Sequence, residues 1–413
     1  MIETVTINNK SIQALTAPTL KNIPLWIKGV LILWLFTALF ADQLANELPL
    51  SCKINETRHY PAFELTIAKL KGDASVRLKY LGLKDQMESA VYAPIPYSPQ
   101  TIDRNNTGYI SPFGSQQLTH WKYRHWMGTD RLGRDILAGM IHGSRVAFVI
   151  GFLAVFFAFI IGVPLGAAAG YYGDKSLKLP LIAILIVSVL LLKWIYLFYL
   201  KTLGAPIHSI ALWGIPLLAI GIVHNLKHAG NTYKSRILNY LFRSCSIPLD
   251  LSLLRIIEIF RALPTLFILL ALLAVFGRSG MMTIAAILAL LMWPTFARYT
   301  RAEFLSLREK EFVSAARLFR KSDFRIIFTD ILPNAKAPLI VITAFGVSAA
   351  ILAESTLSFL GLGLAMDQVS WGSLLSEARK YFPAWWMAVF PGLAIFIIIY
   401  ALNSLGDKMR NAR

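Results

Sequence analysis

The sequence from Arg308 to Pro333, REKEFVSAARLFRKSDFRIIFTDILP, is a charged, amphipathic stretch between two strongly apolar segments. It predicts two short helices joined by a polar corner. Ser322 is expected to cap the second helix, and Pro333 is expected to end it at Leu332. Such a hairpin on a membrane protein suits contact with a soluble partner. The i, i+3, i+4, i+7 spacing of a helix face occurs twice, in Phe312, Ala315, Ala316 and Phe319, and in Phe324, Ile327, Phe328 and Ile331.

The composition of the chain indicates a polytopic membrane protein. Of its 413 residues, 56% are hydrophobic and 15% are charged, and the mean hydropathy is +0.57. A soluble protein of this size could not bury so much apolar surface. The net charge of +18 suggests a nucleic-acid-binding protein, but the apolar runs argue against that class. Basic cytoplasmic loops explain why the net charge is positive. Cys52 and Cys245 fall in segments expected on opposite sides of the membrane, so neither a disulfide nor a metal site is predicted.

Spanning helices need about 20 mostly apolar residues. The first segment that qualifies is expected to stay as an uncleaved span, because its polar leader is long for a signal peptide. Lys193 interrupts the third, where it is expected to snorkel or to face a neighbouring helix. The fourth is short and is the weakest of the set. The eight predicted spans are 26–44, 146–170, 179–200, 209–224, 256–276, 281–296, 338–361 and 386–405.

The charges between the spans predict the orientation of the chain. Residues 298–336 hold nine basic and five acidic side chains, and residues 227–261 hold six basic and two acidic ones. The positive-inside rule places these segments and both termini in the cytoplasm. The cytoplasmic parts are then 1–25, 299–337 and 406–413, and the external parts are 45–145 and 362–385.

The long external connection carries two further predictions. Residues 63–83, FELTIAKLKGDASVRLKYLGL, contain short alternating stretches that predict a small strand-containing domain. Residues 129–145, TDRLGRDILAGMIHGSR, predict a helix near the outer surface, on which Asp130, Arg134 and Asp135 lie close enough to pair.

Four motifs in a fixed order resemble segments of one family. The motifs are Gly128-Thr129-Asp130 with Gly133-Arg134-Asp135 and Gly143-Ser144-Arg145; Gly162-Val-Pro-Leu-Gly166 with Ala169-Gly170-Tyr171-Tyr172-Gly173; the opening hairpin; and Ile351-Leu-Ala-Glu354-Ser-Thr-Leu-Ser358-Phe-Leu-Gly-Leu-Gly363 with Ser370-Trp371-Gly372. They cover roughly residues 125–175 and 250–410. In this order they resemble the binding-protein-dependent ABC importer permeases, specifically the C-type subunit of dipeptide and oligopeptide systems, and the hairpin resembles the cytoplasmic EAA loop of that family.

The resemblance implies an all-α polytopic membrane protein with the six-helix core of a type I ABC importer permease. Two transmembrane helices would be added within residues 171–246, an insert that the ordinary family pattern lacks. A small external α/β-like insertion would follow the first helix. Two added spans return the chain to the side of the membrane from which they start, so the core would keep its six-helix topology.

The resemblance also implies three groups of site residues. An external surface helix would hold Gly128, Asp130, Gly133, Arg134 and Asp135. For Glu354, with Ser355 and Ser358, a translocation-pathway or gating role stands beside a structural hydrogen-bonding role, because Glu354 is the only acid in its span. Coupling to an ATPase would fall to Glu311, Phe312, Ser314, Ala315, Ala316, Phe319, Arg320, Asp323, Phe324, Leu332 and Pro333.

Three residues of the hairpin depart from the EAA pattern. Ser314 replaces an acid, Asp330 replaces an isoleucine, and Arg320 stands where a glycine belongs. Glycine at such a corner serves a tight backbone. Arg320 therefore predicts a different turn or a direct polar contact with the partner, and drift in a structural turn is the alternative.

No G-x-x-x-x-G-K-[ST] phosphate loop occurs in the sequence. The chain is therefore expected to have no ATPase site of its own. With the resemblance, this implies a transporter subunit whose partner subunits bind ATP and Mg, and no cofactor or metal is expected on this chain. The expected partners are a second permease subunit, two ABC ATPase subunits or domains, an external solute-binding protein and membrane lipid, in the inner membrane of a bacterial cell. The alternatives are a nickel-chelate or antibiotic-peptide importer, an ion-coupled secondary transporter, a membrane-embedded enzyme, and a hairpin that rests on lipid headgroups.

Overall fold

The structure, a computed structural model, describes residues 23–411 except 55, 72–74, 84–86, 175–177, 181–243, 247, 277–279 and 366–367. The predicted span 209–224 and nearly all of 179–200 lie outside the described residues. The chain forms two compact units. The first contains Met1–Gly162, Thr265–Phe296 and Pro333–Arg413, and the second contains Val163–Pro264 and Ala297–Leu332.

Long apolar helices dominate the described chain, as the sequence predicts. Four of the described helices are long and apolar enough to cross a membrane, and α2 (Leu25–Leu39) is a shorter apolar helix. Leu263 is extended and separates α10 (Leu249–Ala262) from α11 (Thr265–Phe276), because Pro264 disfavours helix at the residue before it. The long helices are α6 (Ile136–Tyr172), α12 (Met281–Arg308), Asp323–Phe359, which includes α15 (Leu332–Phe359), and α17 (Trp386–Asn411).

The core of the first unit joins α6, α11, α12 and α15. Two glycines on facing helices allow the backbones to approach. A Cβ at Gly151 would lie 3.1 Å from Ile351, and one at Gly346 would lie 3.1 Å from Phe296. Small residues at helix contacts are typical of membrane bundles. The buried apolar residues of this core are Val146, Ile150, Ala154, Leu269, Leu273, Ile284, Ala285, Ile287, Leu288, Ala350 and Leu357.

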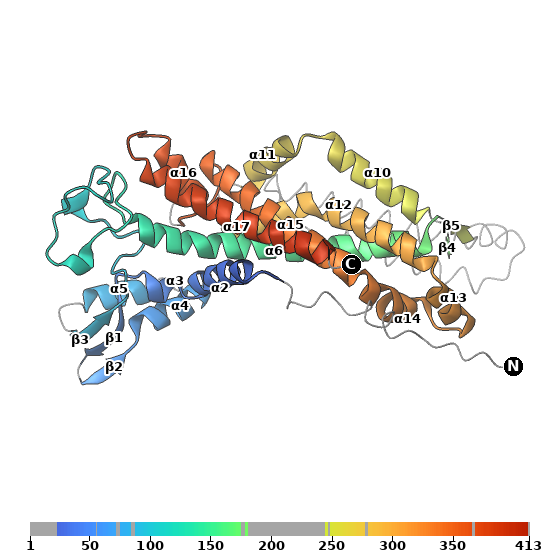
Figure 1. Ribbon diagram of the computed structural model, residues 1–413, viewed down its shortest axis with the longest axis horizontal. Helices are drawn as coiled ribbons and strands as arrows, with labels where there is room; N and C mark the ends of the chain where they lie inside the picture. The colour runs from blue at the N-terminus through green and yellow to red at the C-terminus, as the bar shows by residue number, and fades with distance from the viewer. Residues whose placement is uncertain are drawn as a thin grey trace, which may run out of the picture. The chain divides into compact units, whose positions relative to one another are not determined.

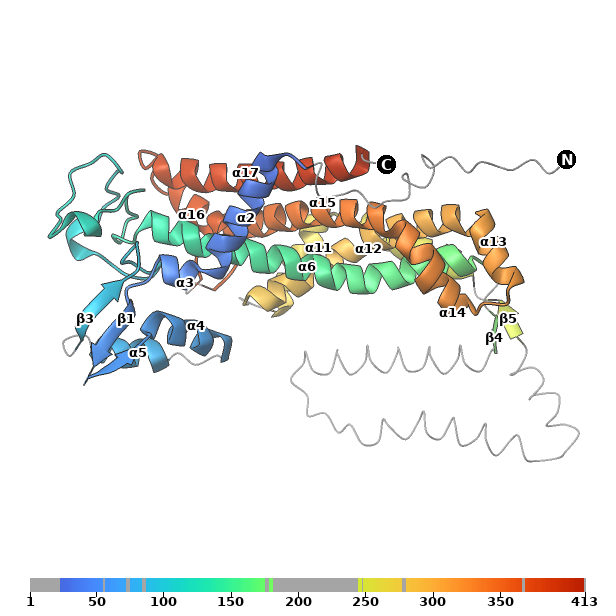
Figure 2. The same ribbon diagram turned by 60° about the horizontal axis from the view of Figure 1, so that its bottom comes forward.

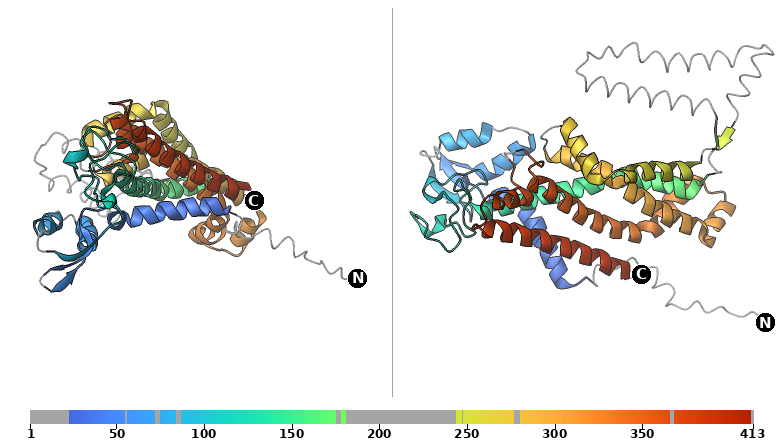
Figure 3. Two further views of the ribbon diagram at one scale, coloured as in Figure 1. Left: turned by 60° about the vertical axis from the view of Figure 1, so that its left-hand side comes forward. Right: turned by 90° about the horizontal axis from the view of Figure 1, so that it is seen from above.

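The last helix of the first unit packs against the first described helix. Figure 2 and Figure 3 show α2 crossing α17. Ile27 of α2 is buried against Ala401 of α17, and the rings of Trp26 and Tyr400 stack with their centroids 5.4 Å apart. The first and last helices described in this unit are therefore held together by apolar contacts.

A small mixed domain follows α2 and the short helix α3 (Ala41–Leu44). Its antiparallel sheet has the strand order β2-β1-β3, built from β1 (Pro49–Ile54), β2 (Thr57–His59) and β3 (Glu88–Tyr92). The helices α4 (Pro61–Lys71) and α5 (Ser75–Gly82) complete it (Figure 1). Its buried residues include Leu48, Cys52, Ile54, Leu65 and Tyr80.

The strands of this domain are not where the alternating pattern of residues 63–83 placed them. That stretch forms α4 and α5, and the sheet comes from the residues on either side. Ala62, Leu65 and Ala68 are buried at three-residue spacing, which fits one helix face. The predicted strand-containing domain is present, but the predicted positions of its strands were wrong. The reason is that short apolar runs are compatible with either a helix or a strand.

The second unit holds the hairpin from Arg308 as far as Leu332. It contains α13 (Glu311–Leu318), α14 (Asp323–Arg325) and the π-helix η5 (Ile326–Ile331), together with the ends of α6 and α12. Two short strands, β4 (Lys178–Pro180) and β5 (Ser244–Ser246), pair antiparallel, with Lys178 opposite Ser246. The chain therefore enters and leaves residues 181–243 at adjacent points.

Candidate functional site

The corner of the hairpin keeps the backbone that a glycine would give it. Arg320 has a φ of +53°, in the left-handed region. Its N–H donates to the carbonyl of Arg317 at 2.9 Å, and the N–H of Lys321 donates to that of Ala316 at 3.2 Å. These two bonds form a Schellman motif that ends α13. The predicted different turn is therefore not formed, and Arg320 occupies the glycine conformation at a cost of about 1–2 kcal/mol.

The second arm begins as the sequence predicts but does not end there. The hydroxyl of Ser322 accepts a hydrogen bond from the N–H of Arg325 at 3.4 Å, so Ser322 caps α14. Pro333, however, lies within a continuous helix from Asp323 to Phe359. The π-helical turn η5 precedes it, and the N–H of Leu332 bonds to the carbonyl of Ile327, five residues back. This wider turn accommodates a proline that would strain a regular α-helix.

The hairpin presents large apolar side chains to its surroundings. Phe319 is 82% exposed and Phe324 is 70% exposed, and the rings of Phe324 and Phe328 lie 4.4 Å apart. Val313 and Ile326 are instead buried beneath the hairpin. Apolar surface of this kind marks an interaction site. The exposed apolar set, which we call the phenylalanine face, consists of Phe312, Leu318, Phe319, Phe324 and Phe328.

The hairpin is fastened to the end of α6 (Figure 2). The hydroxyl of Tyr171 donates to Oδ1 of Asp323 at 2.6 Å, and the guanidinium of Arg317 lies 5.4 Å from the centre of the Tyr171 ring. Asp330 pairs with Lys321 at 3.0 Å across the corner. The family departure at Asp330 thus supplies an ion pair between the two arms.

The end of α6 is in turn packed tightly against α12. A Cβ at Gly170 would lie 2.6 Å from Phe304 and 2.7 Å from the carbonyl of Arg301. The guanidinium of Arg308 donates to the carbonyl of Gly170 at 3.1 Å. Arg301 also binds Asp250 of α10 through two nitrogens. The second unit therefore connects the hairpin to three helices through specific contacts.

The motif before α6 forms turns and not the predicted surface helix. Gly128 and Gly133 have φ values of +77° and +82°, and a Cβ at Gly133 would meet the carbonyl of Asp103 at 2.1 Å. Left-handed glycines of this kind cannot continue an α-helix. Asp135 then caps α6 by accepting from the N–H of Ala138 at 2.7 Å. The prediction of a separate helix over 129–145 was therefore wrong, because residues from 136 belong to α6.

Within these turns, Asp130 and Arg134 pair as predicted. Oδ2 of Asp130 accepts from Nε of Arg134 at 2.6 Å, and Oδ1 accepts from the backbone N–H of Leu132 and Arg134, each at 2.8 Å. Asp130 is buried. The carboxylate fixes the shape of the turn and the direction of the Arg134 side chain.

Glu354 is enclosed by its own chain. Its side chain is 1% exposed, and it accepts hydrogen bonds from Ser358 at 2.7 Å and from Ser355 at 3.4 Å. Ser370 caps α16 (Trp371–Ala378) nearby, and a Cβ at Gly372 would lie 2.3 Å from the carbonyl of Ser355. This geometry favours the structural alternative for Glu354, namely a hydrogen-bonded anchor within α15, at the place where α15 approaches the start of α16.

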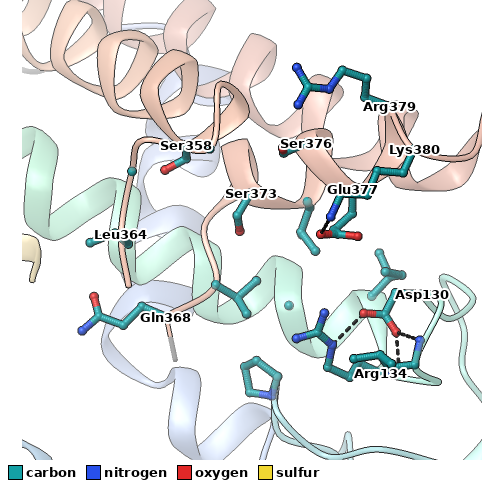
Figure 4. Close-up of a pocket in the computed structure, with 18 of the residues that line it drawn as sticks. Asp130, Arg134, Ser358, Leu364, Gln368, Ser373, Ser376, Glu377, Arg379 and Lys380 are labelled. Atoms are coloured by element: carbon teal, nitrogen blue, oxygen red, sulfur yellow. Dashed lines mark hydrogen bonds and ion pairs between the residues drawn. The ribbon is translucent and has the colours of Figure 1, made fainter. Parts of the chain in front are cut away.

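A pocket of about 480 Å³ lies beside this anchor (Figure 4). It is lined by the turns before α6, by the chain that follows α15 and by α16. Ser358 contributes to its wall, whereas Glu354 does not. Charged residues of both signs meet there, among them Asp130, Arg134, Glu377, Arg379 and Lys380.

Comparison with known proteins places the chain in a family. Residues 240–410 match the family described as "Binding-protein-dependent transport system inner membrane component". The dipeptide transport system permease protein DppC of Alkalihalophilus pseudofirmus is 30% identical over 324 residues, covering 78% of this chain and 80% of that protein. The chain belongs to this family of transport permeases.

Other relatives of the permease have similar names. The di/tripeptide transport system permease protein DppC of Pseudomonas aeruginosa is 29% identical, covering 78% of the permease and 82% of that protein. The glutathione transport system permease protein GsiD of Pectobacterium atrosepticum is 27% identical, covering 70% of the permease and 71% of that protein. An inward-facing structure of the MetNI methionine ABC transporter aligns with a TM-score of 0.40 at 14% identity, covering 66% of the permease and 95% of that chain. The assignment rests on the sequence relationship.

Family membership confirms the predicted class of the permease. It is a multi-pass membrane protein with the type I importer permease fold, and it is the membrane component of a binding-protein-dependent transport system. Within the described part of the permease, no group of three or more histidine, cysteine or acidic side chains could hold a metal ion.

The sequence reasoning missed one buried cluster in the turns before α6. His125 is fully buried, with Nδ1 at 2.8 Å from Asp135 and Nε2 at 3.2 Å from Asp103, and the ring of Tyr97 stacks on it at 4.4 Å. Burial lowers the pKa of His125, but hydrogen bonds and charges from Asp135 and Asp103 outweigh this and raise the pKa from its usual 6.5. Asp135 and Asp103 lie 10 and 22 positions from His125 in sequence, and no motif joins the three residues.

Proposed function

We propose that the permease translocates peptides, either di- or oligopeptides or peptide-like compounds, into the cytoplasm with energy from ATP hydrolysed by separate subunits. The names of the relatives support the substrate class. The sequence has no phosphate loop of its own, which supports a requirement for partner ATPases. ATP and Mg would be bound by those partners, and the permease would act without a cofactor or an enzymatic site.

The phenylalanine face is the observation that carries the proposal. Large exposed aromatic side chains are typical anchors of protein interfaces, and a basic rim suits an acidic groove. That rim consists of Arg317, Arg320, Lys321 and Arg325, which lie on the two arms of the hairpin and in the corner between them. ATP binding would close a pair of ATPase domains and push the hairpin. The fixed contact of Tyr171 with Asp323 would pass that push to α6.

The remaining partners follow from the family. A second permease subunit would complete the translocation path, and an external solute-binding protein would deliver the peptide. The hairpin and both termini would face the cytoplasm, and the small mixed domain would lie outside, in the inner membrane of a bacterium. The adjacent ends of the insert support this topology, because the chain enters and leaves residues 181–243 at one place.

Reconstitution tests the proposal directly. The permease, its partner permease, the ATPase subunits and the binding protein are placed in liposomes, and uptake of a radiolabelled dipeptide is measured. ATP-dependent uptake is expected from the full complex, and none from a complex without the ATPases. Uptake driven by an ion gradient in the absence of ATPase subunits would instead support the secondary-transporter alternative.

A further inference from the structure

The pocket beside α16 has two walls of different origin (Figure 4). One wall consists of the glycine-rich turns before α6 and carries Arg134. The other is the end of α16 and carries Glu377. Both belong to the first unit of the chain. Its volume of about 480 Å³ lies within the range of small-molecule sites in proteins.

Each wall offers a charged group with unused hydrogen-bonding capacity. Arg134 binds Asp130 through Nε alone, and its two terminal nitrogens form no hydrogen bond with a described residue. Glu377 accepts from Lys380 at Oε1, at 2.5 Å, and no described residue donates to its Oε2. The two side chains are 28% and 30% exposed, so each is partly desolvated. A guanidinium can bind a carboxylate in a bidentate way, and a carboxylate can bind an ammonium group.

The rest of the lining is suited to an amide and its side chains. Ser376 and the amide of Gln368 lie on the wall of α16 and the chain before it. Leu364, Val369 and Leu374 supply apolar surface between these polar groups.

The walls are held in place before any ligand arrives. Asp130 accepts two backbone N–H groups and the Arg134 side chain, and it is buried. The start of α16 is fixed by a reciprocal capping box between Ser370 and Ser373. Preorganisation of this kind reduces the entropy that binding costs.

We propose that this pocket binds a short peptide as a zwitterion, with the peptide carboxylate at Arg134 and the peptide ammonium group at Glu377. The inference rests on the proposed function, because it takes the transported class as the ligand. A simple anion would leave Glu377 unused, and a simple cation would leave Arg134 unused. The peptide satisfies both groups, so the permease itself would select against blocked termini.

Binding to the membrane complex without the external binding protein tests the pocket. The complex is placed in lipid nanodiscs, and calorimetry measures binding of Ala-Phe, N-acetyl-Ala-Phe and Ala-Phe-amide. We expect Ala-Phe to bind and each blocked peptide to bind at least tenfold more weakly, since each loses a charge-assisted contact. Equal binding of the three peptides, or no binding of Ala-Phe, would overturn the inference.

The variant Glu377→Gln separates the ammonium contact from general damage. It is expected to weaken binding of Ala-Phe about tenfold and to leave binding of N-acetyl-Ala-Phe unchanged. Glu258→Gln is the matched control, because Glu258 is an exposed acid of α10 that also pairs with a basic neighbour, Arg255. An equal loss for both peptides would show that the variant alters the fold and not the ammonium site, and would count against the inference.

The two proposals fail in different ways. If the full complex with ATPases imports peptides but Glu377→Gln changes neither binding nor the preference for free termini, only the pocket is wrong. If the full complex imports no peptide with free or blocked termini, the proposed function fails and the pocket fails with it.

Discussion

Arg320 shows how one residue can depart from a family pattern without changing the backbone. It takes the left-handed conformation that ends α13, with the same pair of hydrogen bonds that a glycine would allow. The departure therefore adds a positive side chain and a local strain, and it leaves the turn intact.

The strain and the charge of Arg320 can be separated with two substitutions. Arg320→Ala removes the charge and keeps the Cβ, whereas Arg320→Gly removes both. We expect amide exchange to show the corner of the hairpin about 1 kcal/mol more stable in the glycine variant than in the alanine variant. Equal protection of the corner amides from exchange in the two variants would show that a side chain at position 320 does not strain the backbone. A similar loss of ATP-driven uptake in both would assign Arg320 a direct contact with the ATPase.

The Tyr171 hydroxyl joins α6 to the hairpin by its hydrogen bond to Asp323. Tyr171→Phe removes its bond to Asp323 and leaves the ring beneath Arg317. A hydrogen bond to a charged group contributes about 1.5–3 kcal/mol, so amide exchange of residues 311–331 should speed up and ATP-driven uptake should fall. The control is Tyr299→Phe, because Tyr299 is exposed and its contact with Arg298 needs only the ring. If both variants behave like the wild type, Tyr171 does not couple the two segments.

His125 makes the stability of the turns before α6 depend on pH. Its pKa is raised from 6.5 in the folded chain, so the folded state binds the proton more tightly than the unfolded state does. The stabilisation is complete below pH 6.5 and is lost as the pH rises through the folded value. Amide exchange of residues 103–135 should therefore be slower at pH 6 than at pH 8, after correction for intrinsic exchange. In His125→Gln this difference should vanish, and its persistence would assign the dependence to other groups.

At the scale of the element, the two arms of the hairpin were predictable and their continuation was not. The spacing of the apolar residues and the Ser322 cap are local signals, and α13 and α14 follow them. Pro333 was expected to end the second arm. Instead, a π-helical turn before it shifts the backbone hydrogen bonds by one residue, and the helix continues through Pro333. The rule for the residue before proline assumes a regular helix, and the sequence gives no local sign of the wider turn.

The phenylalanine face provides the prediction at this scale. Phe324→Ala is expected to leave the permease folded, since the side chain is exposed, and to reduce ATPase binding and ATP-driven uptake more than tenfold. An anchor residue of an interface contributes about 2 kcal/mol or more. Phe396→Ala on α17 is the control, because Phe396 is 61% exposed but lies away from the hairpin in sequence. Binding that survives both substitutions would exclude the face as the docking site.

At the scale of the whole molecule, composition and motif order were enough to predict the membrane class and the permease core. The positions of the strands and the turns before α6 could not be predicted, because they depend on distant partners. Gly133 is a turn glycine since its backbone approaches Asp103, and His125 is buried since Asp103 and Asp135 lie on either side of it. Such contacts join residues that no spacing rule connects.

The topology of the insert is open to a direct measurement. The predicted spans 179–200 and 209–224 lie outside the described residues but for the first two positions, so the prediction stands on the apolar runs alone. A reporter fused after Leu203 is expected to report an external location, and one fused after Lys234 an internal location. Two internal signals would show that the insert does not cross the membrane.

The pairing of β4 with β5 has a consequence for how this chain could have grown. Pro180 faces Ser244 in the register of the two strands, so a tight two-residue turn could join them. The intervening 63 positions, 181–243, could then be removed or exchanged without moving the helices that precede and follow them. The paired strands β4 and β5 therefore mark an insertion site, at which a segment can be added to a transporter while its other helices keep their positions.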